Sequence, residues 1–110
     1  MWNNRTILVG NLVRDVEIKV TEGEGSKHVA NFTVAVQRPQ SKDAAADFIN
    51  CVAWGQPADY LGQYGKKGSH ITIEGELRTR NYERDGQKVY VTEIYVSSCH
   101  VEKKKDIEEL

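Results

Sequence analysis

Hydrophobic and polar positions alternate along most of this chain with the period of two that is typical of β-strands. In the second such stretch Ala30, Phe32, Val34 and Val36 fall on one face. We expect that face to pack against a core. The pattern predicts five strands: residues 5–13 (continued by 16–20), 28–37, 47–54, 70–82 and 89–96.

A short helix is predicted between the third and fourth strands. Gly55 ends the third strand, and residues 56–64 follow it with a helical pattern. Pro57 suits the first turn of a helix and Gly65 suits its C-terminal cap. The preceding polar loop, residues 38–46, separates the second strand from the third.

The fourth and fifth strands are predicted to form an extended hairpin. Asp85 and Gly86, within a turn at residues 83–88, are the strongest short signal for such a hairpin. Gly75 interrupts the fourth strand. A glycine inside a strand indicates a bulge or a sharp bend at a barrel corner.

The predicted order is three strands, one short helix and a two-stranded hairpin. This order matches the five-stranded Greek-key barrel called the OB-fold. The predicted fold class is therefore all-β. We expect residues 1–102 to form this single domain. The chain turns polar and charged from Val101, so we expect it to fray there and to end in a charged tail at residues 103–110.

Composition agrees with one ordinary globular domain, since 39% of the 110 residues are hydrophobic and 28% are charged. No apolar run approaches the roughly 20 residues that a membrane span needs, and the N-terminus lacks a signal-peptide pattern. We therefore expect a cytoplasmic protein with no membrane partner. The net charge is −1, but residues 66–88 hold six basic residues against four acidic ones, a mild basic patch.

Catalytic and metal chemistry find little support in the sequence. Paired carboxylates, a nucleophile–base set and a phosphate-binding glycine loop are not recognisable, so no catalytic residue and no cofactor is predicted. Cys51 lies in a strand-like apolar run and is interpreted as a buried free thiol. Cys99 and His100 lack a second ligand pair with zinc-like spacing, so no metal site is predicted.

The fourth strand carries the first candidate binding residues. If the period of two holds, Arg78, Arg80 and Tyr82 project from one face, opposite Leu77. Two guanidinium groups beside an exposed ring can hold a phosphate backbone and stack a base of a single strand. The alternative is a solvated face in which the arginines pair with Glu74 or Glu76, and in which Tyr82 shields the sheet.

The third strand is apolar on both faces, so its periodicity leaves two readings open. One face holds Phe48, Asn50, Val52 and Trp54, and the other holds Ile49, Cys51 and Ala53. The second set is compact and fits a small barrel interior, which would expose Phe48 and Trp54 as stacking platforms. The alternative makes both rings ordinary core aromatics.

Further basic residues could contact phosphates from the loops. They are Lys66, Lys67, Arg38, Lys42, Arg84 and Lys88. Lys66 and Lys67 have a strong alternative role, because cations after a helix C-terminus also interact with the helix dipole. For the others the alternative role is solubility.

Five stretches of the chain resemble the bacterial single-stranded DNA-binding proteins, in the same order as in that family. They are ILVGNLVRDVE (7–17), VANFTVAV (29–36), ADFINCVAWG (46–55), YGKKGSHITIEGELRTRNYE (64–83) and YVTEIYV (90–96). ADFINCVAW is similar to the Gram-positive and phage branch in particular.

The resemblance implies a homotetramer of OB-folds that binds single-stranded DNA without sequence preference, in replication, recombination or repair. It places DNA-stacking rings on Phe48, Trp54 and Tyr82, and basic contacts on Arg78, Arg80 and Lys67. It also implies dimer contacts through the N-terminal strand, at about residues 3–9.

Two departures from the family pattern affect what the resemblance implies. A tryptophan that many relatives carry after the second strand is absent, and Gln40 occupies that neighbourhood. Relatives also continue into a Gly/Pro/Gln-rich linker and an acidic tip that recruits replication and repair enzymes. This chain ends DIEEL without that linker, and we expect a frayed tail.

Two other functions stay open at this point. One is a family-like adaptor, akin to primosomal components, that acts mainly through protein partners. The other is an OB-fold enzyme such as a nuclease, which would need a carboxylate cluster for a metal.

Overall fold

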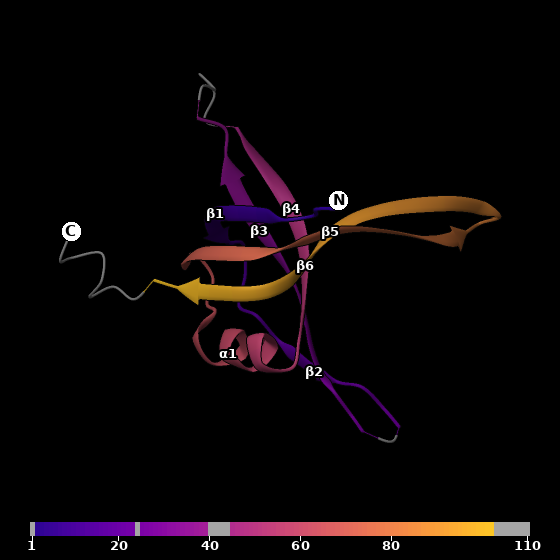
Figure 1. The fold of residues 1–110 in the computed structure, drawn as a ribbon, viewed down its shortest axis with the longest axis horizontal. Coiled ribbons are helices and arrows are strands. Elements are labelled where there is room, and N and C mark those ends of the chain that lie inside the picture. The colour runs from indigo at the N-terminus through magenta and orange to yellow at the C-terminus, as the bar shows by residue number, and fades with distance from the viewer. Residues whose placement is uncertain (1, 24, 40–44, 103–110) are drawn as a thin grey trace.

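The computed structural model describes residues 2–23, 25–39 and 45–102. Six strands and one helix lie within these ranges (Figure 1). They are β1 (Thr6–Leu12), β2 (Ile18–Val20), β3 (His28–Gln37), β4 (Ala46–Trp54), α1 (Gln56–Tyr64), β5 (His70–Arg84) and β6 (Gln87–Val101).

Five of the strands close into a barrel in the order β1-β5-β6-β4-β3, because β1 also pairs with β3 at Asn11↔Ala35 and Leu12↔Val34. Neighbours are antiparallel except β4 and β6, which pair in parallel at Cys51↔Ile94 and Val52↔Tyr95. The sequence-predicted OB-fold is confirmed. The stretch that was predicted to continue the first strand instead forms β2, a separate short strand on the far edge of β3.

The barrel interior is aliphatic, and the alternation of β3 faces it as predicted. Ala30, Phe32 and Val34 are buried, with at most 5% of each residue exposed. Ile71 and Ile73 from β5 and Ile94 from β6 complete this layer of the core.

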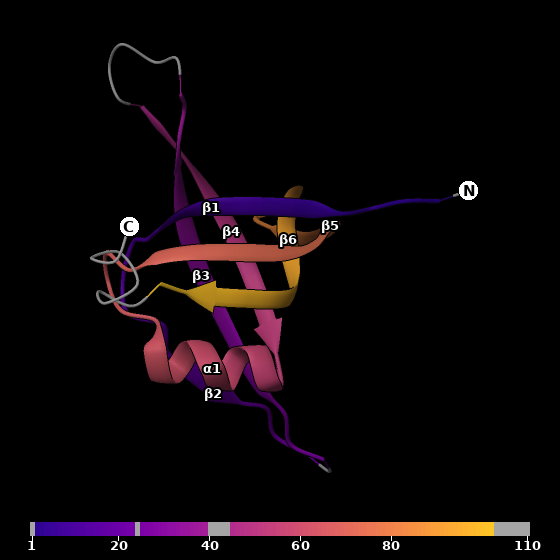
Figure 2. The same cartoon turned by 60° about the vertical axis from the view of Figure 1, so that its left-hand side comes forward.

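Helix α1 covers one end of the barrel and has the predicted bounds (Figure 2). Ala58 and Leu61 are its buried residues. Gly65 caps the helix, and its N–H donates to the carbonyl oxygen of Leu61 at 2.6 Å, but its backbone is extended rather than left-handed. A Cβ at Gly65 would lie 2.6 Å from that oxygen and 2.9 Å from Val16 Cγ2, so close packing explains the glycine.

Beyond the barrel, β5 and β6 continue as a long two-stranded arm (Figure 1). Asp85 and Gly86 form its turn with φ angles of 52° and 78°, and Arg84 pairs directly with Gln87. Left-handed angles at both positions are those of the tightest hairpin turn, as the sequence predicted. The wider predicted loop at residues 83–88 is wrong, because the strands pair up to this two-residue turn.

A β-bulge separates the arm from the barrel. Pairing shifts from Glu74↔Ser98 to Gly75↔Val96, which leaves Ser97 as the extra residue. The Ser97 hydroxyl donates to the carbonyl oxygen of Glu74 at 2.9 Å. The predicted irregularity at Gly75 is therefore confirmed.

The last strand, β6, is longer than the fifth strand predicted at residues 89–96. It continues past Val96 to Val101, which pairs with Ile71 and is 4% exposed. The expectation that the chain frays from Val101 is wrong, because this side chain closes the core next to α1. Residues 103–110 lie outside the described residues, so the charged tail there stays a prediction.

Both cysteines are free; Cys51 is buried and Cys99 is partly buried. Burial raises the pKa of Cys51 to about 12 and that of Cys99 to about 11. Cys51 is thus a buried thiol, as expected. Within the described ranges, no group of three or more metal-ligating side chains occurs, and no helix is long and apolar enough to cross a membrane.

Candidate nucleic-acid interface

The outer face of β4 presents two aromatic rings to solvent. Phe48 is 67% exposed and Trp54 is 43% exposed, while Cys51 and Ala53 face the interior at 2% and 0%. Of the two readings left open by the sequence, the structure therefore has the one with exposed rings. Asn50 lies between the two rings on the same exposed face.

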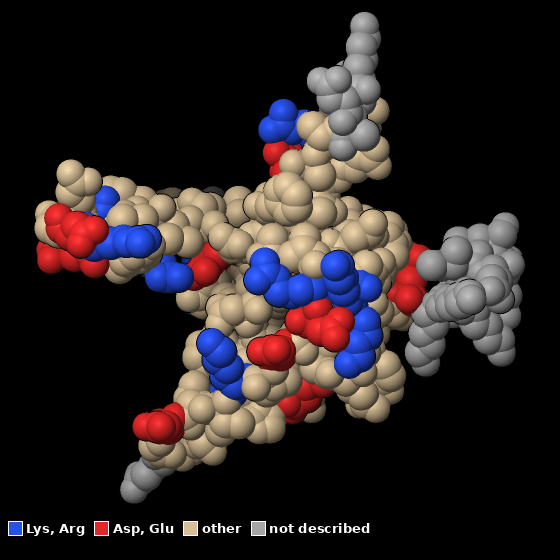
Figure 3. Space-filling view, turned by 180° about the vertical axis from the view of Figure 1, so that it is seen from behind, with Lys and Arg blue, Asp and Glu red and all other residues tan. Residues whose placement is uncertain are grey.

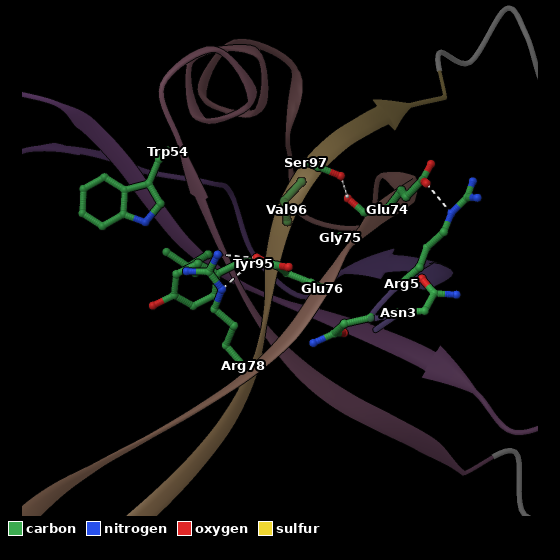
Figure 4. Close-up of a pocket in the computed structure, with 12 residues that line it drawn as sticks. Asn3, Arg5, Trp54, Glu74, Gly75, Glu76, Arg78, Tyr95, Val96 and Ser97 are labelled. Carbon is green, nitrogen blue, oxygen red and sulfur yellow. Dashed lines mark hydrogen bonds and ion pairs between the residues drawn. The ribbon is translucent and has the colours of Figure 1, made fainter. Parts of the chain in front are cut away.

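Trp54 lies at the edge of a cavity of about 530 Å³ between β4, the base of the arm and the N-terminal segment (Figure 4). Arg78 and Tyr95 line the same cavity, and the Arg78 guanidinium carbon is 4.4 Å from the centre of the Tyr95 ring. Arg78 Nε also donates to Glu76 Oε1 at 2.8 Å. A ring, a cation and a second ring thus surround one hollow.

A second cavity, of about 410 Å³, lies beside Tyr82 and Arg80. Asn50 and Glu93 also line it. Arg80 lies 5.9 Å from the centre of the Tyr82 ring and donates from Nε to Glu93 Oε1 at 2.8 Å. The hydrogen bond to Glu93 is the main reason why the pKa of Arg80 is raised.

Arg78, Arg80 and Tyr82 share one face of β5, as predicted. The ion pairs of the arginines and the exposure of the opposite face differ from the expectation. Arg78 pairs with Glu76, as the alternative reading proposed, whereas Arg80 pairs with Glu93 rather than with Glu74 or Glu76. Leu77, on the opposite face, is 46% exposed because the arm extends past the barrel.

Glu93 and Tyr95 were not among the predicted site residues. Glu93 stands on β6 directly opposite the predicted Arg78, and Tyr95 stands opposite Glu76 with the Arg78 guanidinium over its ring. Only 7% of Glu93 is exposed, so its carboxylate is a buried charge that Arg80 compensates. A two-residue turn at Asp85 and Gly86 sets these pairings, and that signal was available in the sequence.

The remaining predicted basic residues lie outside both cavities. Arg38 forms a fork with Asp47, with Nη2 to Oδ1 at 2.7 Å, and this hydrogen bond lowers the pKa of Asp47 and raises that of Arg38. The others are Lys66 and Lys67, exposed in the turn after α1, and Arg84 and Lys88, in strands beside the tip of the arm. Arg84 and Lys88 are thus not loop residues. Lys42 and Gln40 lie outside the described residues.

Charge on the rear face is mixed. Figure 3 shows basic and acidic side chains close together near the middle of that face and along the arm. A polyanion would therefore meet local basic sites rather than one uniform positive field, in agreement with the net charge of −1.

Comparison with known proteins adds a family to this geometry. A family model described as "Single-strand binding protein family" matches residues 3–102. A single-stranded DNA-binding protein of Oceanobacillus iheyensis is 48% identical over 99 residues, which cover 86% of this chain and 60% of the relative.

Two proteins of Streptococcus pyogenes serotype M18 are similar as well. Single-stranded DNA-binding protein 2 is 47% identical over 83% of this chain and 57% of the relative, and single-stranded DNA-binding protein 1 is 43% identical over 94% and 81%. The chain thus spans about 60% of the length of the first of these curated relatives. By the extent of these matches, the chain belongs to the single-strand binding protein family.

Proposed function

We propose that this chain binds single-stranded DNA without strong sequence preference, by stacking bases on exposed rings and holding phosphates with neighbouring cations. The carrying observation is that Trp54, Arg78 and Tyr95 line one cavity. Phe48 continues the stacking surface along β4, and Tyr82 with Arg80 forms its second part. The names of these relatives describe single-stranded DNA binding, which supports this proposal.

Stacking explains why such binding tolerates any sequence, since every base has a flat face. Each stacked base contributes roughly 1–3 kcal/mol in measured cases. The exposed pair between Arg78 and Glu76 is a weak competitor for phosphate, because solvent-exposed ion pairs contribute little. Asn50 can add a hydrogen bond between the rings. Weaker phosphate contacts are proposed for the basic residues farther out: Lys66, Lys67, Arg38, Arg84 and Lys88.

We propose a homotetramer as the working assembly. Ile7 and Val9 are apolar residues on the outer face of β1, and they are 57% and 49% exposed. Such an apolar strand face supports contacts between copies through the N-terminal strand. We further propose a cytoplasmic, nucleoid-associated protein that works with replication, recombination or repair proteins. The family is one of non-enzymatic DNA-binding proteins, and no observation favours the adaptor function.

Oligo-dT is expected to quench the fluorescence of Trp54, because a stacked base lies against the indole ring. Trp2 is 99% exposed and would add a second signal, so the titration uses a Trp2→Phe variant. The logarithm of the binding constant should fall linearly with the logarithm of salt concentration, with a slope of about −0.7 for each phosphate contact. No quenching at low salt in this single-tryptophan protein would contradict the proposed function.

The assembly is expected to elute and scatter light as four chain masses. Light scattering coupled to size exclusion measures this directly, and a Val9→Glu variant should reduce the mass because it places a charge on the β1 face. A wild-type dimer with poor affinity for DNA would instead favour the adaptor function.

A further inference from the structure

A third groove lies next to the Tyr82 cavity, over the corner between β1 and β2. It has a volume of about 570 Å³ and is lined by Arg14, Asp15, Glu17, Lys19, Asn31 and Lys67. Three of these residues are basic and two are acidic. Among them, Lys67 alone has so far been connected with DNA.

This groove and the Tyr82 cavity are adjacent. Arg14 and Asn31 line both of them, so the two hollows share a wall. Thr33 and Asn50 line the Tyr82 cavity together with Asn31, and Thr33 Oγ1 donates to Asn50 Oδ1 at 3.1 Å. The part of that cavity near Asn31 thus carries amide and hydroxyl groups, which can face a sugar–phosphate chain without repelling it.

The cations of the third groove are available for a ligand. Among the described residues, no carboxylate forms an ion pair with Arg14, Lys19 or Lys67, whereas Arg38, Arg78 and Arg80 each have one. Asp15 accepts a hydrogen bond from the backbone N–H of Lys67 at 2.8 Å, which holds that turn against the groove.

The arm offers a competing direction for the strand, but its charge is balanced. Arg84 and Lys88 at its tip stand beside Glu83 and Asp85, and Glu83 pairs across the hairpin with Lys88. The third groove keeps an excess of one positive charge. Phosphates that leave Tyr82 are therefore held better toward the β1–β2 corner than toward the tip.

We infer that the DNA strand leaves the Tyr82 cavity across Asn31 and enters the third groove, where Arg14 and Lys19 bind its phosphates together with Lys67. This inference rests on the proposed function and adds Arg14 and Lys19 to its binding residues. The ligand class is the phosphodiester backbone of a single strand, and bases on this part of the path are not read.

The test uses an oligo-dT of about 15 nucleotides. It compares the salt dependence of binding between the wild type and an Arg14→Gln/Lys19→Gln variant. The slope is expected to fall by about 1.4, since each lost phosphate contact removes about 0.7. If the two proteins bind equally at 1 M salt, the variant binds about 25-fold more weakly than the wild type at 0.1 M.

A Glu17→Gln variant is the matched control, because it removes a charge of the opposite sign from the same groove. Its binding should become about twofold tighter. A general disturbance of the groove would weaken both variants, and this result would overturn the inference. Equal melting temperatures show that both variants fold.

Failure of this inference is distinct from failure of the proposed function. If the wild type does not bind oligo-dT, the proposed function is wrong, and the inference falls with it. If the wild type binds but the Arg14→Gln/Lys19→Gln variant keeps the wild-type slope, the third groove is not on the DNA path, and stacking on Trp54 and Tyr82 stands unchanged.

Discussion

The Phe48→Ala/Trp54→Ala variant is expected to lose about 2–6 kcal/mol of binding free energy for oligo-dT, which is twice the roughly 1–3 kcal/mol of one stacked base. Even the lower value corresponds to roughly 30-fold weaker binding. Both rings lie on the outer face of β4, and neither belongs to the hydrophobic core. The thermal stability of the variant should therefore stay close to that of the wild type.

Anisotropy of a dye-labelled oligo-dT measures the affinity, because the variant lacks the fluorescent residue Trp54. Tyr90→Ala is the matched control: Tyr90 is 73% exposed but stands on the face of the arm opposite Tyr82. A Trp54→Phe variant keeps a flat ring and should retain most of the affinity. If the double variant unfolds, or if Tyr90→Ala weakens binding as much, exposed stacking on β4 is the wrong explanation.

The buried face of a strand can be predicted from the sequence when one of its two faces is clearly apolar. In β3 one face carries Ala30, Phe32 and Val34, and the predicted bounds and these core residues agree with the structure. In β4 both faces are apolar, and periodicity could not choose. Closure of the barrel decides the choice, because the interior opposite Ala30 and Phe32 has room for Ala53 and Cys51 but not for two large rings.

The end of β6 shows how a bulge hides a strand from a search for alternation. Ile94 faces the core on one side of Ser97, whereas Val101 faces it on the other, so the inward positions change from even to odd numbers. A strict period of two therefore ends at Val96. The polar run of Ser97, Ser98 and His100 then resembles a tail, although it pairs with β5.

Glu93 and Tyr95 were missed for a different reason. Their partners were predicted from one strand alone, without setting the register of the hairpin. Once Asp85 and Gly86 form a two-residue turn, the register follows, and Glu93 falls opposite Arg78. The sequence does not predict which rings and arginines line which of the two cavities, because this depends on the twist of the arm.

Replacement of Gly75 by alanine is expected to cause the largest loss of stability among single substitutions considered for this domain. A Cβ at this position would lie 2.1 Å from the carbonyl oxygen of Tyr95 and 2.9 Å from its carbonyl carbon. These are backbone atoms of the paired strand, so relief of the clash requires the bulge itself to open. We expect a loss of about 3 kcal/mol or more, at or above the upper end of the usual cost of overpacking.

Because 1 kcal/mol shifts the melting temperature of a domain of this size by about 4–8 °C, the midpoint should fall by roughly 12–24 °C. Gly86→Asn is the matched control, since no atom outside its two chain neighbours lies within 4 Å of a Cβ at Gly86, and Asn is one of the few residues that adopt a φ of +78°. That variant should melt within a few degrees of the wild type.

The same substitution also tests how the bulge positions the binding surface. Gly75 is the point from which the arm leaves the barrel, and it lines the cavity that holds Trp54, Arg78 and Tyr95. If the bulge opens, Arg78 and Tyr95 move relative to Trp54, so oligo-dT affinity should fall even at a temperature where the variant is fully folded. A Gly75→Ala protein that melts and binds like the wild type would mean that the bulge accepts a side chain, and that close backbone packing does not set the direction of the arm.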